Sequence, residues 1–192
     1  MHTSTGATMQ LKPFNAAATR RQCGFSLIES LIGLAVTVLA LGGSLPGLKA
    51  SLERRHLDGA AAQLETDIQY ARSLAVAQNR TLRISFRNDA GGSCYLVHSG
   101  NANACQCGAD GIAVCTGGAR AARAVRFENS GPVRMTSNVG SMVLEPSKGT
   151  VSPTGTIQLQ GGAGHTVKVI VNIMGRARSC SPAPVLNGYA AC

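Results

Sequence analysis

The strongest feature of the hydropathy pattern is an apolar run from Phe25 to Leu48 that carries a single charge, Glu29. As a helix, this run would extend about 36 Å, which is enough to cross the hydrocarbon core of a bilayer. A carboxylate in such a segment is costly in lipid and needs a partner. The pattern therefore predicts a transmembrane helix over 25–48, with Glu29 either serving assembly or lying near the interfacial end of an ordinary signal anchor.

Apolar residues recur after this run at spacings of three and four, with charged residues between them. This periodicity predicts that an amphipathic helix continues the anchor over 49–80 and packs on the protein's own domain. Pro46, with glycines nearby, should kink or locally melt the helix. The apolar stripe consists of Leu57, Ala61, Leu64, Ile68, Ala71 and Ala75.

From position 81 the period changes to two, which predicts a β-rich domain over 81–192. A turn at 88–92 should join the first two strands as a hairpin, and Gly161–Gly164 should join the last two. The segment Asn101–Gly118 shows no period and predicts a loop that needs disulfides to be ordered. The expected strands are Thr81–Arg87, Cys94–Ser99, Ala124–Glu128, Val133–Ser137, Ser141–Glu145, Thr156–Gln160 and Thr166–Ile173.

The residues before the apolar run, Met1 to Gly24, include Lys12, Arg20 and Arg21 and no acid. Basic residues before an apolar helix favour a cytoplasmic N-terminus and export of the remainder. We therefore exclude residues 1–24 from the fold as a leader peptide.

Gly24 is followed by Phe25, Ser26, Leu27, Ile28 and Glu29. This series resembles the class III leader of type IV pilins and pseudopilins. The resemblance implies that a prepilin peptidase cuts between Gly24 and Phe25 and that Phe25 is then N-methylated. It also implies that Glu29, fifth in the mature chain, neutralises the new amino group of a neighbouring subunit in the apolar filament core. The protein would lie in the bacterial inner membrane with a periplasmic C-terminal domain, and would then join a pilus at the cell surface.

Two further blocks resemble the GspH/FimT family: ARSLAVAQNRTLRISF, and LEPSKGTVSPTGTIQLQ with HTVKVIVNIMGRARSC. The resemblance implies an α+β, type IV pilin-like fold in which a long kinked N-terminal helix packs on two antiparallel sheets. It also implies other major and minor pilins as partners. The 101–118 insert matches no part of the family pattern.

Cysteine usage agrees with export. Cys23 lies in the leader, and an even number in an exported domain indicates up to three disulfides. Cys180 and Cys192 are the natural local pair, whereas the pairing of the other four is not readable. A four-cysteine zinc site is the less favoured alternative, because Cys-x-Cys is not the usual knuckle spacing. We expect no metal or cofactor. The six cysteines are Cys94, Cys105, Cys107, Cys115, Cys180 and Cys192.

Charge is the most informative chemical feature, since the chain carries a net +9 from 18 basic and 9 acidic residues. No acid follows Glu145, although several basic residues do. Such a region attracts polyanions, and arginine suits bidentate contacts with phosphate. The alternatives are a solvated basic face and a docking surface for an acidic pilin.

The sharpest candidate is Gly175-Arg-Ala-Arg178, which directly follows the strongest predicted strand. Gly175 would let the chain turn, the two arginines would project from a loop, and a Cys180–Cys192 disulfide would hold that loop. In FimT-type minor pilins this motif is associated with DNA binding in natural transformation. The hypothesis is sequence-independent binding of double-stranded DNA. Its residues are Arg176, Arg178 and Gly175, supported by Lys168, Lys148 and Arg134.

Catalytic signatures are lacking, so we do not expect an enzyme. The histidines are isolated in sequence, and there is no Gly-x-Ser-x-Gly element or phosphate-binding loop. Two rivals to a DNA-binding minor pilin stay open. One is a structural minor pilin or GspH-like pseudopilin that touches no DNA, and the other is a role in type II secretion.

Overall fold

The computed structural model describes residues 26–162 and 164–192. Their order is one helix, α1 (Leu27–Ala77), followed by twelve strands: β1 (Leu82–Asp89), β2 (Gly92–His98), β3 (Cys105–Cys107), β4 (Ala113–Cys115), β5 (Ala121–Glu128), β6 (Val133–Ser137), β7 (Ser141–Leu144), β8 (Val151–Ser152), β9 (Gly155–Gly161), β10 (Thr166–Val171), β11 (Ala177–Ser181) and β12 (Ala190–Ala191). The class is α+β, as expected. The strands form two five-stranded sheets and one two-stranded ribbon, and all pairs are antiparallel except β11 with β12.

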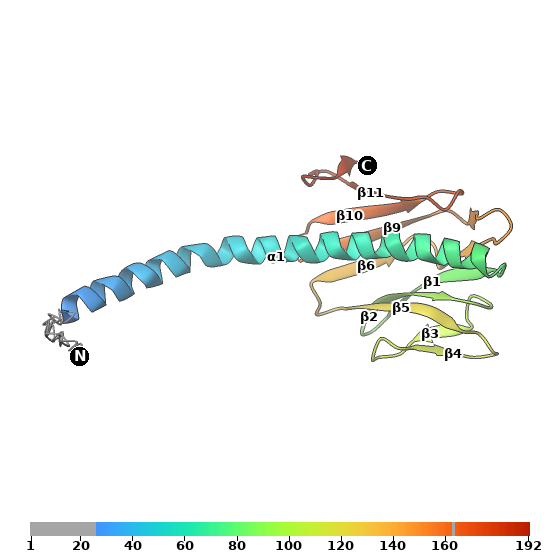
Figure 1. Ribbon diagram of the computed structural model, residues 1–192, viewed down its shortest axis with the longest axis horizontal. Coiled ribbons are helices and arrows are strands. Elements are labelled where there is room, and N and C mark those ends of the chain that lie inside the picture. Colours follow the sequence, from blue (N-terminus) through green and yellow to red (C-terminus); the bar gives the residue numbers. More distant parts are fainter. Residues whose placement is uncertain (1–25, 163) are drawn as a thin grey trace, which may run out of the picture. The chain divides into compact units, whose positions relative to one another are not determined.

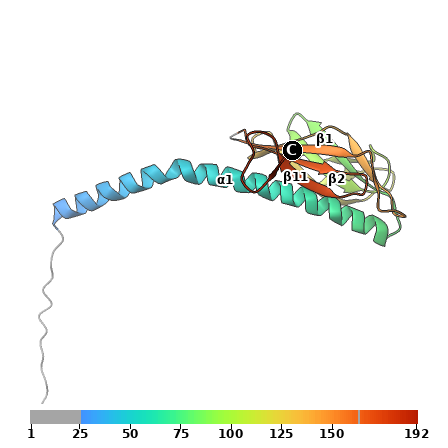
Figure 2. The ribbon, with the colours of Figure 1, turned by 90° about the horizontal axis from the view of Figure 1, so that it is seen from above.

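Residues Ser44–Cys192 form one compact unit, called here the 44–192 unit. Within it, the first sheet has the order β5-β2-β1-β7-β8 and the second has the order β12-β11-β10-β9-β6. In Figure 1, β10 and β11 of the second sheet are seen above the helix, and β1, β2 and β5 of the first sheet below it. Figure 2 shows the helix running along one side of the sheets. The part of α1 before Ser44 belongs to a separate unit.

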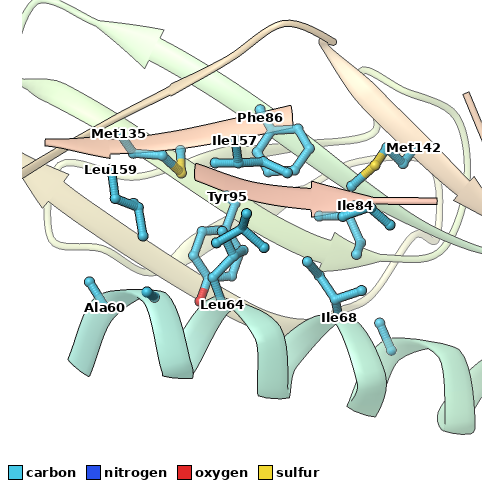
Figure 3. Close-up of a cluster of buried hydrophobic side chains, with 14 of the residues drawn as sticks. Ala60, Leu64, Ile68, Ile84, Phe86, Tyr95, Met135, Met142, Ile157 and Leu159 are labelled. Carbon is cyan, nitrogen blue, oxygen red and sulfur yellow. The ribbon is translucent and has the colours of Figure 1, made fainter. Parts of the chain in front are cut away.

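The core of the 44–192 unit lies between the helix and the inner faces of both sheets. All six residues of the predicted helical stripe are buried there. They meet Ile84 and Phe86 of the first sheet and Ile157 and Leu159 of the second (Figure 3). Every residue of this core lies between Leu57 and Leu186, so the unit carries a complete core of its own.

The helix continues through Pro46, so the local melting expected there is not observed. It ends at Ala77 because Asn79 adopts a left-handed conformation, with φ of 46°. The Arg80 amide then donates to the Ala75 carbonyl at 3.0 Å and the Asn79 amide to that of Val76 at 3.1 Å. This is the Schellman arrangement that satisfies the last carbonyls of a helix.

The predicted strands are present with small changes at their ends, and both predicted hairpins are confirmed by the β1–β2 and β9–β10 pairings. β5 begins at Ala121 rather than Ala124, and β10 ends at Val171 rather than Ile173. Sequence reasoning missed the short strands β8 and β12, which have only two residues each, and β11.

The segment 101–118 is not the irregular loop that its composition predicts, because it contains the β3–β4 ribbon. Disulfides join Cys105 to Cys115 within the ribbon and Cys94 of β2 to Cys107 of β3. The four-cysteine zinc alternative is therefore wrong, since all four thiols are in disulfides.

The 101–118 insert covers the outer face of the first sheet. Leu96 and His98 of β2 point away from the main core and are nevertheless fully buried. The Arg87 guanidinium of β1 donates to the Ala102 carbonyl at 2.7 Å. The insert thus supplies a second, smaller layer that shields this side of β2 from solvent.

His98 is the titratable group in this second layer. One ring nitrogen, Nδ1, donates to the Ser99 carbonyl at 2.9 Å, and the other, Nε2, lies 2.8 Å from the Ser85 hydroxyl. Burial lowers the pKa of His98 below its ordinary value of 6.5, and the charges of Arg83 and Arg87 act in the same direction. The imidazole is therefore neutral in the folded protein at neutral pH.

We expect the 44–192 unit to lose stability as the pH falls from about 7 to 5. Below about pH 6.5 the unfolded chain binds a proton at His98 more readily than the folded protein does. The free energy of unfolding therefore falls by up to about 1.4 kcal/mol for each pH unit below this value. Urea unfolding at pH 7.5 and 5.5 measures the effect. His98→Gln should show a smaller loss over this interval, whereas the exposed control His56→Gln should behave like the wild type. An unchanged pH dependence in His98→Gln would contradict this role.

Candidate nucleic-acid interface

The outer face of the second sheet gathers three of the predicted basic residues. In β10, Val167, Val169 and Val171 point to the core, so Lys168 points outward. Cross-strand partners share a face. The register pairs Lys168 with Cys180 of β11 and Ile170 with Arg178, so Arg178 is on the outward face too.

The same register extends this face across β9 to β6. Gln158 pairs with Lys168, Gln160 pairs with Thr166, and Arg134 of β6 pairs with Gln160. With strands about 4.8 Å apart and about 3.3 Å per residue, Arg178, Lys168 and Arg134 form a diagonal about 20 Å long. We call this surface the outer basic face.

No acidic residue occurs in any of the five strands that form this sheet. Arg178 and Arg134 are exposed, and Lys168 is half-buried. The residues between them are Gln158, Gln160, threonines and the partly exposed Ile170. A hollow of about 230 Å³ beside Arg134 is lined by Gln160 and by glycines of adjoining turns. The strands of this face thus present cations, neutral hydrogen-bonding groups and one apolar side chain, and a carboxylate, that of Glu53 on α1, lies beside Gly162 at the hollow.

Arg176 adjoins this face in the β10–β11 turn, whereas Arg178 belongs to β11 and not to the loop that the sequence predicts. Gly175 lies between β10 and β11 with φ of 69°. A Cβ at this position would come within 2.9 Å of Cδ of Arg72 on α1. Gly175 therefore serves the turn through its conformation and its close approach to the helix, and presents no side chain to a ligand.

Lys148 lies in the β7–β8 loop, which adjoins the same turn. The Val151 amide donates to the Ile173 carbonyl at 2.8 Å, and the Arg72 side chain donates to the Gly149 carbonyl at 2.8 Å. Lys148 is exposed, but Glu145 is exposed in the same loop. Its contribution to the local potential is therefore partly offset.

Arg123 and Arg126, which precede Arg134 in the chain, do not extend the basic surface. Arg126 pairs with Asp89 through two contacts of 2.8 Å, and this hydrogen bonding lowers the pKa of Asp89 and raises that of Arg126. Arg123 pairs with Asp67 at 3.1 Å. Asp67, which its position in the sequence assigns to the polar side of the helix, is in fact buried.

The disulfide Cys180–Cys192 joins the pair expected from the sequence, but it does not hold the 175–178 turn. It closes the segment after β11, where β12 pairs with β11. Tyr189 in this segment donates its hydroxyl to Asp58 of the helix at 3.0 Å. Burial and the Asp58 carboxylate raise the pKa of Tyr189 to about 12. The hydrogen bond to Asp58 holds this ring against the helix.

Two of the predicted processing residues, Gly24 and Phe25, lie outside the described residues. Glu29 lies in the first turn of α1 and is exposed. In the part of the chain that the structure describes, no helix is both long and apolar enough to span a membrane. Nor does any group of three or more potential ligands gather to hold a metal in residues 26–162 and 164–192.

Sequence reasoning missed Ile173 and Met174, which are exposed at the tip of the β10–β11 turn. It also missed Gln69 and Arg72, two residues of α1 that contact this turn at Gly175. The only signal in the sequence is an apolar pair directly before the Gly175-Arg-Ala-Arg178 motif.

Two solved structures resemble this one. The type IV minor pilin FimU of Pseudomonas aeruginosa is 20% identical, with a TM-score of 0.48 over 68% of this chain and 96% of that chain. The minor pseudopilin EpsH of the type 2 secretion system of Vibrio cholerae is 12% identical, with a TM-score of 0.43 over 66% of this chain and 98% of that chain. A search of curated proteins finds no match.

Two family models match the sequence. The prokaryotic N-terminal methylation motif matches residues 19–45, a range that includes Gly24, Phe25 and Glu29. The model for type II transport protein GspH matches residues 60–175, from the core half of α1 to the glycine of the β10–β11 turn. This second match covers more than half of the chain, and the protein therefore belongs to the GspH family of type IV pilin-like proteins.

Proposed function

We propose that this protein is a minor type IV pilin that binds extracellular double-stranded DNA without sequence preference, for DNA uptake in natural transformation. The observation that carries the proposal is the outer basic face: Arg178, Lys168 and Arg134 share one side of an acid-free sheet. Arg176 adds a fourth cation at the adjoining turn. Lys148 has a lesser part, and Gly175 acts by shaping the turn.

The dimensions of this face suit a duplex backbone. A diagonal of about 20 Å corresponds to about six base pairs at 3.4 Å per pair. Guanidinium groups bind phosphate oxygens, and the amides and hydroxyls between them donate neutral hydrogen bonds to the same backbone. Contacts of this kind position a duplex but do not distinguish its sequence.

The first part of α1 supports the placement in a filament. Between positions 27 and 39 it exposes a series of large apolar side chains that lipid or neighbouring subunits would have to cover. We propose that a prepilin peptidase cleaves the chain between Gly24 and Phe25 at the inner membrane. Glu29 would then pair with the new amino group of a neighbouring pilin when the subunit enters the pilus.

Duplex titration across a salt series tests the DNA-binding proposal on the oxidised 44–192 unit. Arg176→Ala/Arg178→Ala is expected to weaken binding by about 10- to 100-fold and to reduce the slope of log affinity against log salt by about two. Unrelated duplexes of mixed sequence and matched step composition should bind equally. Lys49→Ala/Arg120→Ala removes the same charge from exposed sites outside the second sheet and should change affinity little. Absence of binding by the folded wild type at low salt would exclude the proposal for this unit.

The competing function is a structural role without DNA binding, in a pilus or in type II secretion. The exposed apolar residues of α1 suit this role as well as they suit a DNA-binding pilin. The full-length chain separates the two. If filament assembly alone is the function, Glu29→Ala abolishes it and Arg176→Ala/Arg178→Ala leaves it intact. If DNA uptake is the function, the arginine variant assembles normally and fails to take up DNA.

A further inference from the structure

The tip of the β10–β11 turn holds two large apolar side chains in water. Ile173 is 60% exposed and Met174 is 51% exposed. They precede Arg176 and Arg178, so an apolar pair and two guanidinium groups lie within six residues. Single exposed apolar residues are common on proteins, but an adjacent pair at the tip of a turn marks a contact surface more often.

Hydrogen bonds within the turn fix its backbone. The Gly175 amide donates to the Asn172 carbonyl at 2.9 Å, and the Asn172 amide donates to the Arg176 carbonyl at 3.1 Å. The Asn172 side chain also accepts from the Arg176 amide at 2.9 Å. The turn is thus closed on both sides of the apolar pair.

Neighbouring elements fix the turn from outside. The Val151 amide donates to the Ile173 carbonyl at 2.8 Å, and Gln69 of α1 donates to the Gly175 carbonyl at 3.2 Å. Gly175 itself is buried against Arg72 and Val151. Because the backbone is held in this way, the two apolar side chains cannot fold back onto the core, and they are already ordered for contact with a partner.

We propose, on the basis of the DNA-binding function proposed above, that Ile173 and Met174 form a wedge that enters the minor groove and partly unstacks one base step. Isoleucine and methionine are among the side chains that proteins insert in this way, and such insertion kinks the duplex. Arg176 and Arg178 bind the flanking phosphates. The kink is directed toward the major groove, away from the turn, so the acid-free sheet beside the turn contacts only the backbone next to the wedge.

This binding mode predicts a preference for deformable DNA. Insertion costs unstacking energy, which is lower at TA and CA/TG steps and at mismatches than in stiff A-tracts. The protein should therefore distinguish duplexes by flexibility and not by base identity. A purely electrostatic face would bind flexible and stiff duplexes of equal length with equal affinity.

The test uses the oxidised 44–192 unit and a 24-base-pair duplex with a fluorophore at each end. We expect the wild type to raise energy transfer between the ends by bending the duplex, and to bind a duplex with a central mismatch more tightly. Ile173→Ala/Met174→Ala should abolish the bend and the mismatch preference and weaken binding by about tenfold. Ile112→Ala/Val114→Ala, an exposed apolar pair of the insert, is the matched control and should behave like the wild type.

The outcomes separate this inference from the proposed function. If the wild type binds no duplex, the proposed function fails and the wedge fails with it. If Ile173→Ala/Met174→Ala remains folded by circular dichroism and binds and bends the duplex as the wild type does, the wedge alone is overturned. If the variant instead loses binding to vesicles containing anionic lipid while duplex binding is unchanged, the turn is a membrane contact and the wedge is likewise overturned.

Discussion

Replacing Arg123 with alanine is expected to lower the free energy of unfolding of the 44–192 unit by about 3 kcal/mol. Asp67 is only 4% exposed and faces the core from the second half of α1. It accepts from the Tyr95 hydroxyl at 2.7 Å and pairs with Arg123 at 3.1 Å. Removal of the arginine leaves a buried carboxylate without its cation. We place the effect at the low end of the usual range because the Arg123 side chain is half exposed.

Urea unfolding measures this effect, and Arg120→Ala is the matched control. Arg120 is exposed one residue before the same strand, so its loss should change stability by no more than about 0.5 kcal/mol. Adding Asp67→Ala to Arg123→Ala should recover part of the loss, because the uncompensated charge is then gone. The buried Tyr95 hydroxyl would still lack its partner, so recovery should be incomplete. Equal stability of Arg123→Ala and the wild type would show that Tyr95 alone satisfies Asp67.

Replacing Cys94 and Cys107 with alanine is expected to lower the free energy of unfolding by about 2–4 kcal/mol. Their disulfide joins positions 13 residues apart and holds the 101–118 insert against β2. Without it, the ribbon closed by Cys105–Cys115 should separate more often from the sheet and expose Leu96. We therefore expect faster hydrogen exchange in β2 as well as a lower urea midpoint.

The pair Cys180→Ala/Cys192→Ala is the control for this second prediction. That disulfide closes a similar span of 12 residues, but it lies at the end of the other sheet. Its loss should lower the free energy of unfolding by a comparable amount. Hydrogen exchange in β2 through local opening should be unchanged. If β2 remains as protected without Cys94–Cys107 as with it, packing alone holds the insert in place.

Much of the main core could be predicted from the sequence because its signals are periodic. The helical stripe from Leu57 to Ala75 and the alternation in Thr166–Val171 each assign one face to the interior, and the structure buries those faces. The second layer could not be predicted. Leu96 and His98 belong to a strand buried on both sides, and only the tertiary contact with the 101–118 insert makes them so.

The basic region was identified from its composition, but its geometry was not. The absence of acids after Glu145 can be read in the sequence, and it leaves β9 to β12 of the second sheet without a carboxylate. That Arg134 shares a face with Lys168 and Arg178 depends on β6 pairing with β9, a contact between distant segments. Likewise, Arg123 and Arg126 add to the charge of the chain in the sequence, yet each is paired with a carboxylate in the fold.

The insert and the outer basic face belong to different sheets, and this separation is useful for labelling. At the insert, Gly117 and Gly118 both have positive φ, and no atom lies within 4 Å of where their side chains would begin. A short peptide tag between these two glycines would neither disturb the packed ribbon nor touch Arg134, Lys168 or Arg178. The position therefore offers a handle for following single subunits by microscopy while the surface proposed to bind DNA stays unmodified.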